Sequence, residues 1–220
     1  MSQPTLGYWD IRGIAEPIRF LLHYKGVDFV DKRYTFDDRA AWEKDKTSLK
    51  LDFPNLPYYL DGNIRLTQSN TILRYLAKKH ELDGKTEEEY LRVSLAEQQI
   101  SDLRASLIQL SYNDNFEKLK PDFVNQVPSH LKLVANFLGN RKFLAGDSVT
   151  YVDFMAYHVI DYLRYLIPNL LTDFPNLRDH QDRIRNLPEL RKYLKSPAYK
   201  PWPLFSPAAQ FGGEGPEPKR

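Results

Sequence analysis

A proline at the start of an apolar run limits the folds open to this chain more than any other feature of its sequence. Pro57 follows Leu56 directly and precedes a run that is typical of a β-strand. Because proline has no amide hydrogen to donate to a β-ladder, either the strand begins with a free edge or the Leu56-Pro57 bond is cis. Asp61-Gly62 then separates this run from the next one, which indicates a tight hairpin.

The hairpin leads into a helix whose first turn can bind an anion. Gln68, Ser69 and Asn70 stand immediately before an apolar-periodic segment, which indicates a helix start. The unpaired N–H groups and the positive end of the helix dipole make such a terminus a site for a carboxylate or a phosphate. An ordinary helix cap is the alternative, and the three residues taken alone favour it.

Strand-like and helix-like patterns alternate before this hairpin. Residues 5–9 predict a strand, Glu16-Pro17 opens a helix that ends before Gly26, and residues 27–36 predict a second strand. With the hairpin and the helix after it, this order predicts a compact α/β layer in which helices cover a small sheet.

A change of pattern predicts a second domain. We expect an α/β domain over residues 1–82, a linker over 83–89 and an all-helical domain over 90–220 with an irregular C-terminal tail. Thr150, with an aspartate three residues later, resembles a capping box at the start of one helix in the second domain. The tail is rich in proline and glycine, and we expect it to be loose from Gly212 onward.

The composition excludes several kinds of chemistry. The chain has no cysteine, which removes disulfides, thiolate zinc sites, CxxC redox motifs and a cysteine nucleophile. Its five histidines lie far apart with no ligand spacing, so we assign no metal, and we expect His80 and His180 to be solvated. A glycine-rich phosphate loop is also missing.

Charge and hydropathy bear on partners and location. The 31 basic residues are interleaved with 29 acidic ones, for a net charge of +2, which argues against nucleic acid as the partner. No segment reaches the roughly 18 uninterrupted apolar residues of a membrane span. No secretory signal is visible either. We therefore expect a soluble cytoplasmic protein that binds neither nucleic acid nor a membrane.

One tyrosine stands where small α/β domains usually hold their ligands. Tyr8 lies near the end of the first predicted strand, before the segment that leads into the first helix. Its hydroxyl would point over the carboxyl ends of the strands. Tyrosine packs cores more often than it catalyses, so its position alone favours packing over catalysis.

Four segments taken together resemble the cytosolic glutathione S-transferases of the mu class. They are LGYWDIRG at residues 6–13, DFPNLPY at 52–58, QSN at 68–70 and FEKLKP at 116–121. The similarity continues to residues 205–206 and so covers nearly the whole chain. The family implies a thioredoxin-like α/β N-terminal domain with a cis Pro57, an all-α C-terminal helical domain, and a homodimer with two active sites.

The resemblance implies an enzyme that uses glutathione as a co-substrate and needs no cofactor. Tyr8 matches the catalytic tyrosine, whose hydroxyl donates a hydrogen bond to the glutathione sulfur and favours the thiolate. Gln68 and Ser69 match the residues that hold the γ-glutamyl carboxylate, and the backbone of Leu56 matches the partner of the cysteinyl group. Asp102 matches a residue that reaches the glutathione bound in the other subunit. The remaining glutathione contacts that the resemblance implies are Trp9, Ile14, Arg39, Trp42, Lys46, Asn55 and Pro57.

The resemblance also implies an electrophile pocket and a dimer contact. Tyr112 matches a residue whose hydroxyl can assist some additions as an acid. Phe53 matches an aromatic key that inserts between helices of the other subunit, and Arg74 with Glu97 matches a further dimer contact. Ser94 stands where many members carry an acidic residue beside that arginine. The implied electrophile pocket consists of Ile11, Ile14, Ile108, Tyr112 and Phe205.

We expect a glutathione transferase that conjugates the thiolate of glutathione to hydrophobic electrophiles. The alternative is a binding protein on the same fold whose catalysis is weak or incidental, and the matched set of Tyr8, Gln68, Ser69 and Asp102 argues against it. A glutaredoxin-like thiol oxidoreductase is disfavoured because it requires a cysteine.

Overall fold

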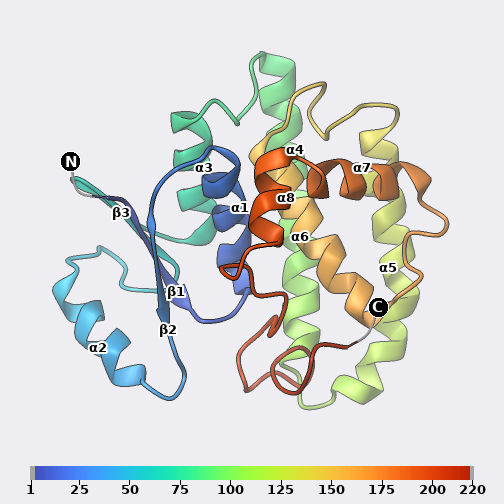
Figure 1. The fold of residues 1–220 in the computed structure, drawn as a ribbon. Coiled ribbons are helices and arrows are strands. Elements are labelled where there is room, and N and C mark those ends of the chain that lie inside the picture. The colour runs from blue at the N-terminus through green and yellow to red at the C-terminus, as the bar shows by residue number, and fades with distance from the viewer. Residues whose placement is uncertain (1–2, 219–220) are drawn as a thin grey trace.

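A small mixed sheet lies beside a group of helices in the computed structural model, which describes residues 3–218 (Figure 1). The strands are β1 (Thr5–Trp9), β2 (Val30–Tyr34), β3 (Tyr58–Asp61) and β4 (Ile64–Thr67). They lie in the order β2-β1-β3-β4, with β1 parallel to β2 and the other pairs antiparallel. The predicted hairpin is therefore confirmed, and the second strand is shorter than the predicted range of 27–36.

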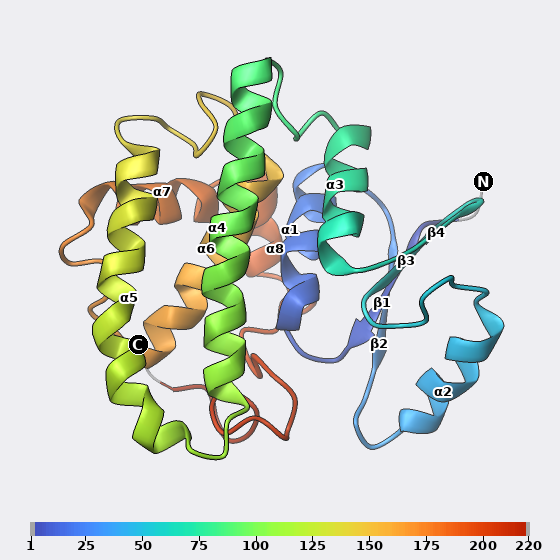
Figure 2. The same ribbon diagram turned by 180° about the vertical axis from the view of Figure 1, so that it is seen from behind.

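Helices cover both faces of this sheet. α1 (Glu16–Tyr24) and α3 (Ser69–Lys79) lie on one face, and α2 (Arg39–Ser48) lies on the other (Figures 1 and 2). Side chains alternate along a strand, so Tyr59 joins the core with α1 and α3 while Tyr58 packs its ring on Trp42 of α2. A short 3₁₀ turn, η1 (Gly13–Ala15), connects β1 to α1.

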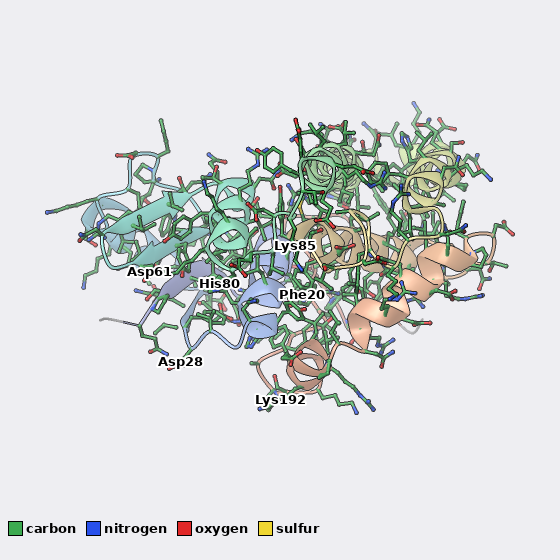
Figure 3. All side chains as sticks on the ribbon, turned by 90° about the horizontal axis from the view of Figure 1, so that it is seen from above. Phe20, Asp28, Asp61, His80, Lys85 and Lys192 are labelled. Atoms are coloured by element: carbon green, nitrogen blue, oxygen red, sulfur yellow. The ribbon has the colours of Figure 1, made fainter. Side chains whose placement is uncertain are left out.

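The second half of the chain is helical. Its helices are α4 (Glu87–Ser111), α5 (Phe116–Leu138), α6 (Tyr151–Leu166), α7 (Pro175–Arg185) and α8 (Pro188–Leu194). Nearly every residue of α6 is buried, as expected for a helix in the centre of a bundle. Phe20 of α1 is fully buried and packs edge-to-face on Tyr157 of α6 and Tyr193 of α8. Figure 3 shows Phe20 between the sheet side and the helical side of the molecule. No helix within residues 3–218 is long and apolar enough to cross a membrane.

This architecture confirms the predicted fold class, a thioredoxin-like α/β part followed by an all-α part. The domain boundaries stay a prediction, and α4 begins at Glu87, inside the segment that we expected to be a linker. Thr86 explains the early start, because its side chain accepts the backbone N–H of Glu89 and three glutamates follow in the first turn.

The start of α6 contains a buried carboxylate that several donors share. Asp153 forms the predicted capping box with Thr150, and it also accepts the backbone N–H of Leu144 at 2.9 Å and Nε2 of His180 at 2.8 Å. Asp153 and His180 are both fully buried, so the expectation of a solvated His180 is wrong. The sequence pattern could not show this contact, because it joins the first turn of α6 to the middle of α7.

We predict that Asp153→Ala destabilises the fold strongly. The substitution leaves several buried donors without an acceptor, and each such group costs about 1–3 kcal/mol, so we expect the free energy of unfolding to fall by about 3 kcal/mol or more. Urea unfolding followed by circular dichroism measures this. Asp147→Ala, at an exposed carboxylate nearby, is the control, with an expected change below about 0.5 kcal/mol. Equal effects of the two substitutions would contradict the assignment.

Candidate active site

The hydroxyl of Tyr8 is buried near the carboxyl end of β1. Tyr8 is only 7% exposed, and the backbone N–H of Ile14 donates to its oxygen at 3.4 Å. Burial raises the pKa of Tyr8 to about 12, although the Ile14 hydrogen bond and the Arg19 charge oppose the rise. The hydroxyl is therefore protonated at neutral pH, and its own hydrogen can be donated to a ligand.

A glycine allows the turn after β1 to lie against this tyrosine. Gly13 has a φ of +48°, and a Cβ at this position would lie 2.4 Å from a ring carbon of Tyr8. Any larger residue would therefore displace the ring. The carbonyl oxygen of Gly13 lies 2.9 Å from Nε2 of His158 and accepts from the hydroxyl of Tyr162 at 3.4 Å. Two residues of α6 thus fix the turn that contacts Tyr8.

The start of α3 leaves its first N–H groups free of a side-chain cap. Gln68 occupies the cap position with a φ of 69°, a left-handed conformation that costs a non-glycine residue about 1 kcal/mol or more. Its side chain is exposed and makes no capping hydrogen bond. Ser69, the first helical residue, is buried. The ordinary-cap alternative is thus not supported at this helix start, which keeps the donors that an anion would use.

In the segment before β3, a neighbouring side chain already accepts the backbone N–H of Leu56. The Leu56-Pro57 bond is cis, as the second of our two alternatives requires. The N–H of Leu56 donates to Oδ1 of Asn55 at 2.9 Å, and Asn55 itself is exposed. A peptide that pairs with the Leu56 backbone must therefore replace the Asn55 side chain.

Aromatic rings from three elements gather beside this segment. Trp9 stacks on Phe36 with ring centroids 4.6 Å apart, and the buried Trp42 stacks on Tyr58 at 6.1 Å. Two predicted cationic contacts of glutathione lie on α2 at its start and in its last turns. Arg39 is exposed, with its guanidinium 5.9 Å above the Phe36 ring, and the ammonium of Lys46 lies 3.8 Å from the Glu43 carboxylate.

The C-terminal tail forms an apolar wall with α4. The ring of Phe205 contacts those of Tyr112 and Tyr162 edge-to-face, at 5.8 and 5.5 Å. The Tyr112 hydroxyl donates to Oγ of Ser206 and accepts its backbone N–H, both at 3.0 Å. The tail continues to Gly212, which is buried and whose carbonyl accepts the N–H of Phe205, so the expectation of a loose tail is wrong at this residue. Residues 214–218 are exposed, and residues 219–220 lie outside the described part of the chain.

The remaining predicted pocket residues differ in exposure. Ile11 is buried and Ile14 is half-buried, both in the turn after β1, and Ile108 is half-buried on α4, one helical turn before Tyr112. The backbone N–H groups of Arg12 and Gly13 donate to tail carbonyls at 3.0 Å each, so this turn and the tail adjoin. The site therefore has a polar side at α3 and β3 and an apolar side at α4 and the tail.

Comparison with known proteins decides the family. The family models of the glutathione S-transferase N-terminal and C-terminal domains match residues 4–78 and 101–197. The chain belongs to the glutathione S-transferase family. It is 49% identical to mouse Glutathione S-transferase Mu 1 over 214 residues, covering 95% of this chain and 98% of that one. It is 48% identical to a glutathione S-transferase of Tyrophagus putrescentiae over 216 residues, covering 97% and 98%.

Solved structures agree with this assignment. The crystal structure of the glutathione S-transferase Blo t 8 matches the fold with a TM-score of 0.89 at 34% identity, covering 94% of this chain and 99% of that one. The resemblance to the mu class is thus confirmed by relatives over nearly the full length. As a glutathione transferase, the chain uses reduced glutathione as a co-substrate.

Several predicted residues of this transferase lie on the surface of the single chain. Phe53 is 73% exposed, and Asp102 is exposed on α4. Arg74 and Glu97, predicted as a dimer contact, pair with each other within one chain at 2.5 Å. Glu97 is buried and also accepts the hydroxyl of Tyr151, so this ion pair joins α3 to α4 and α6.

The sequence did not identify all the residues that support the transferase site. His158 and Tyr162, which contact the Gly13 carbonyl, show only the helical periodicity of a buried face. Arg104, which donates to Asn70 at the start of α3, was not singled out either, although it stands four residues before Ile108 and eight before Tyr112. That spacing places the three residues on one face of α4 and was the available signal.

We predict that Gly13→Ala impairs the transferase more than a matched glycine substitution does. Its Cβ would collide with the Tyr8 ring, so we expect at least a ten-fold loss of kcat/KM with a chlorinated aromatic substrate. Gly62→Ala is the control, because Gly62 has a similar φ of +57° but no atom within 4 Å of the added Cβ. Full activity of the Gly13 variant would show that the turn does not position Tyr8.

Proposed function

We propose that the Tyr8 hydroxyl donates a hydrogen bond to the sulfur of glutathione and favours its thiolate. The supporting observation is that within residues 3–218 this buried oxygen makes one hydrogen bond, in which it accepts the N–H of Ile14. Its hydrogen is therefore free for the sulfur. The raised pKa of Tyr8 keeps this hydrogen in place across the neutral range.

One such bond is sufficient for the chemistry. A free thiol has a pKa of about 8.5, so roughly 3% of it is ionised at pH 7. A charge-assisted hydrogen bond contributes about 1.5–3 kcal/mol, which corresponds to about one to two pKa units. A large fraction of the bound thiol would then be ionised near neutral pH. The thiolate attacks the electrophile directly, the leaving group departs, and no covalent intermediate with the protein forms.

The tripeptide extends from β3 to the start of α3. The uncapped N–H groups beside Gln68 and Ser69 receive the γ-glutamyl carboxylate, and the Leu56 backbone, next to Pro57, pairs with the cysteinyl group. Asn55 gives up its bond to Leu56 and turns toward the glycyl end, so one hydrogen bond replaces another. The glycyl end and the walls of the cleft are completed by Trp9, Ile14, Arg39, Trp42 and Lys46.

The electrophile binds on the apolar side. Ile11, Ile14, Ile108 and Phe205 surround it, and Tyr112 lies at the rim, 40% exposed. Its hydroxyl already exchanges hydrogen bonds with Ser206, which orients it toward the tail. Tyr112 then assists those additions whose product oxygen needs a proton.

We predict that Tyr8→Phe raises the pKa of the enzyme-bound thiol by about one to two units and lowers turnover at neutral pH. The profile of kcat/KM against pH with a chlorinated aromatic substrate measures both effects. Binding of S-methylglutathione, which has no ionisable thiol, is the control and should not change. A pH profile identical to that of the wild type would overturn the role of Tyr8, and glutathione affinity without turnover in the wild type would favour the binding-protein alternative.

We infer that the transferase is a homodimer in which Phe53 is the principal anchor. Phe53 is 73% exposed, far more than a phenylalanine normally is in a monomer. An apolar groove of about 270 Å³ lies between α4 and α5, lined by Leu95, Ala96, Gln99, Ile100, Leu133, Val134, Phe137 and Leu144. Leu95 and Leu133 are 64% and 56% exposed at its rim. A second copy of the chain supplies both surfaces at once, because a two-fold axis places each Phe53 in the groove of the other copy.

The proposed dimer also gives roles to Asp102 and Arg74. Asp102 is exposed on α4 and, in the dimer, reaches the γ-glutamyl amine of glutathione bound to the other copy. Arg74, exposed over more than half of its side chain, lies at this interface while it remains paired with Glu97.

The cytoplasmic location stays a prediction from the sequence.

We predict that Phe53→Ser shifts the protein from dimer to monomer at micromolar concentration, since it removes the aromatic anchor from two grooves at once. Sedimentation velocity measures the change. Val30→Ser, at an exposed apolar residue on β2, is the matched control and should leave the assembly intact. A wild-type protein that sediments as a monomer would contradict the dimer itself.

A further inference from the structure

Arg104 lies between the two sides of the proposed active site. On α4 it precedes Ile108 by one turn and Tyr112 by two, so the three side chains lie along one helical face. Its Nη2 donates to Oδ1 of Asn70 at 3.0 Å, and Asn70 follows Ser69 at the start of α3. The guanidinium is thus joined to the helix start that would hold the γ-glutamyl group.

The charge of Arg104 has no direct counter-ion. Among residues 3–218 it takes part in no ion pair, and its Nη1 is shielded from solvent without a hydrogen-bond acceptor. The fully buried Arg12 and Arg19 differ, because Arg12 pairs with Asp161 at 2.9 Å and Arg19 with Glu16 at 3.1 Å. Burial lowers the pKa of Arg104, but an arginine remains charged at neutral pH.

Each ionisable group around Arg104 is either neutral or already paired. Glu97, on the same helix, is the carboxylate that acts on it most, and Arg74 and Tyr151 already donate to that carboxylate. Tyr8 on β1 and Tyr162 on α6 are neutral, since burial raises the pKa of each. His158 on α6 is neutral too, since burial lowers its pKa well below its usual value. Arg104 therefore keeps a positive charge without an ion-pair partner between the start of α3 and the apolar side of the proposed site. Burial dominates the raised pKa of Tyr8, and the Arg104 charge is one of those that oppose the rise.

We propose that Arg104 acts through the field of its charge as a second stabiliser of the glutathione thiolate, beside the hydrogen bond from Tyr8. The inference rests on the proposed function, since it requires the sulfur to lie at the Tyr8 hydroxyl. Arg104 need not touch the sulfur. A single charge within about 10 Å, in a site with an effective dielectric constant of about 20, changes a thiol pKa by about one unit.

The experiment measures the ionisation of glutathione bound to Arg104→Gln from the ultraviolet absorbance of its thiolate as a function of pH. We expect the pKa of the bound thiol to rise by about one unit, and kcat/KM to fall about ten-fold at a pH below the wild-type thiol pKa and to recover at higher pH. Arg104→Lys, which keeps a positive charge, should restore most of this shift. Arg141→Gln, at an exposed arginine after α5, is the control for a general change of net charge and should match the wild type.

Binding of S-methylglutathione separates the field from a structural role through Asn70. Affinity within two-fold of the wild type, together with a raised thiol pKa, supports the proposal. Weakened affinity with an unchanged thiol pKa would show that Arg104 only supports the α3 start, and this result would overturn the proposal. Should glutamine at this position prevent folding, Arg104→Met, which keeps a long apolar side chain, replaces it. A wild-type complex without thiolate absorbance would instead refute the Tyr8 assignment, and this inference with it.

Discussion

The close contact between the Tyr8 ring and the turn at Gly13 is the constraint on which the proposed active site depends. It sets the tyrosine oxygen within reach of the Ile14 N–H, and it removes the oxygen from solvent. A buried hydroxyl that accepts one hydrogen bond still has its own hydrogen to donate to a ligand. That donor is useful only if it cannot find another acceptor within the protein, and the turn provides an N–H rather than a carbonyl at this point.

The turn is held from the helical half of the chain. His158 and Tyr162 of α6 reach the Gly13 carbonyl, and the tail accepts the N–H groups of Arg12 and Gly13. Both α6 and the tail are far from β1 in sequence, so the geometry of Tyr8 exists only when the sheet and the bundle are packed together. The buried Phe20, with ring contacts to α6 and α8, provides part of that packing.

Local sequence patterns predicted the helices and strands, whereas long-range contacts determined features that these patterns do not show. The hairpin, the start of α1 at Glu16-Pro17 and the capping box at Thr150 each depend on residues within a few positions, and each was predicted. The helical spacing of His180 between Leu177 and Ile184 indicates the buried face of α7, but its partner Asp153 stands 27 residues earlier, and no local pattern could show that contact. The resemblance to a family supplied the roles proposed for Tyr8 and the other site residues, but it gave no account of Arg104, which makes no ion pair within residues 3–218.

The two sides of the proposed site are held differently. On the proposed glutathione side, side chains decide which backbone donors are available: Asn55 accepts the Leu56 N–H, whereas Gln68 leaves the start of α3 without a side-chain cap. On the electrophile side, the tail is held largely by its backbone, from the turn at Gly13 to the Gly212 carbonyl that accepts the N–H of Phe205. Backbone bonds do not depend on the identity of the side chain. In the proposed site, the apolar wall can therefore change its side chains, and with them the range of electrophiles, while the turn that contacts Tyr8 stays in place.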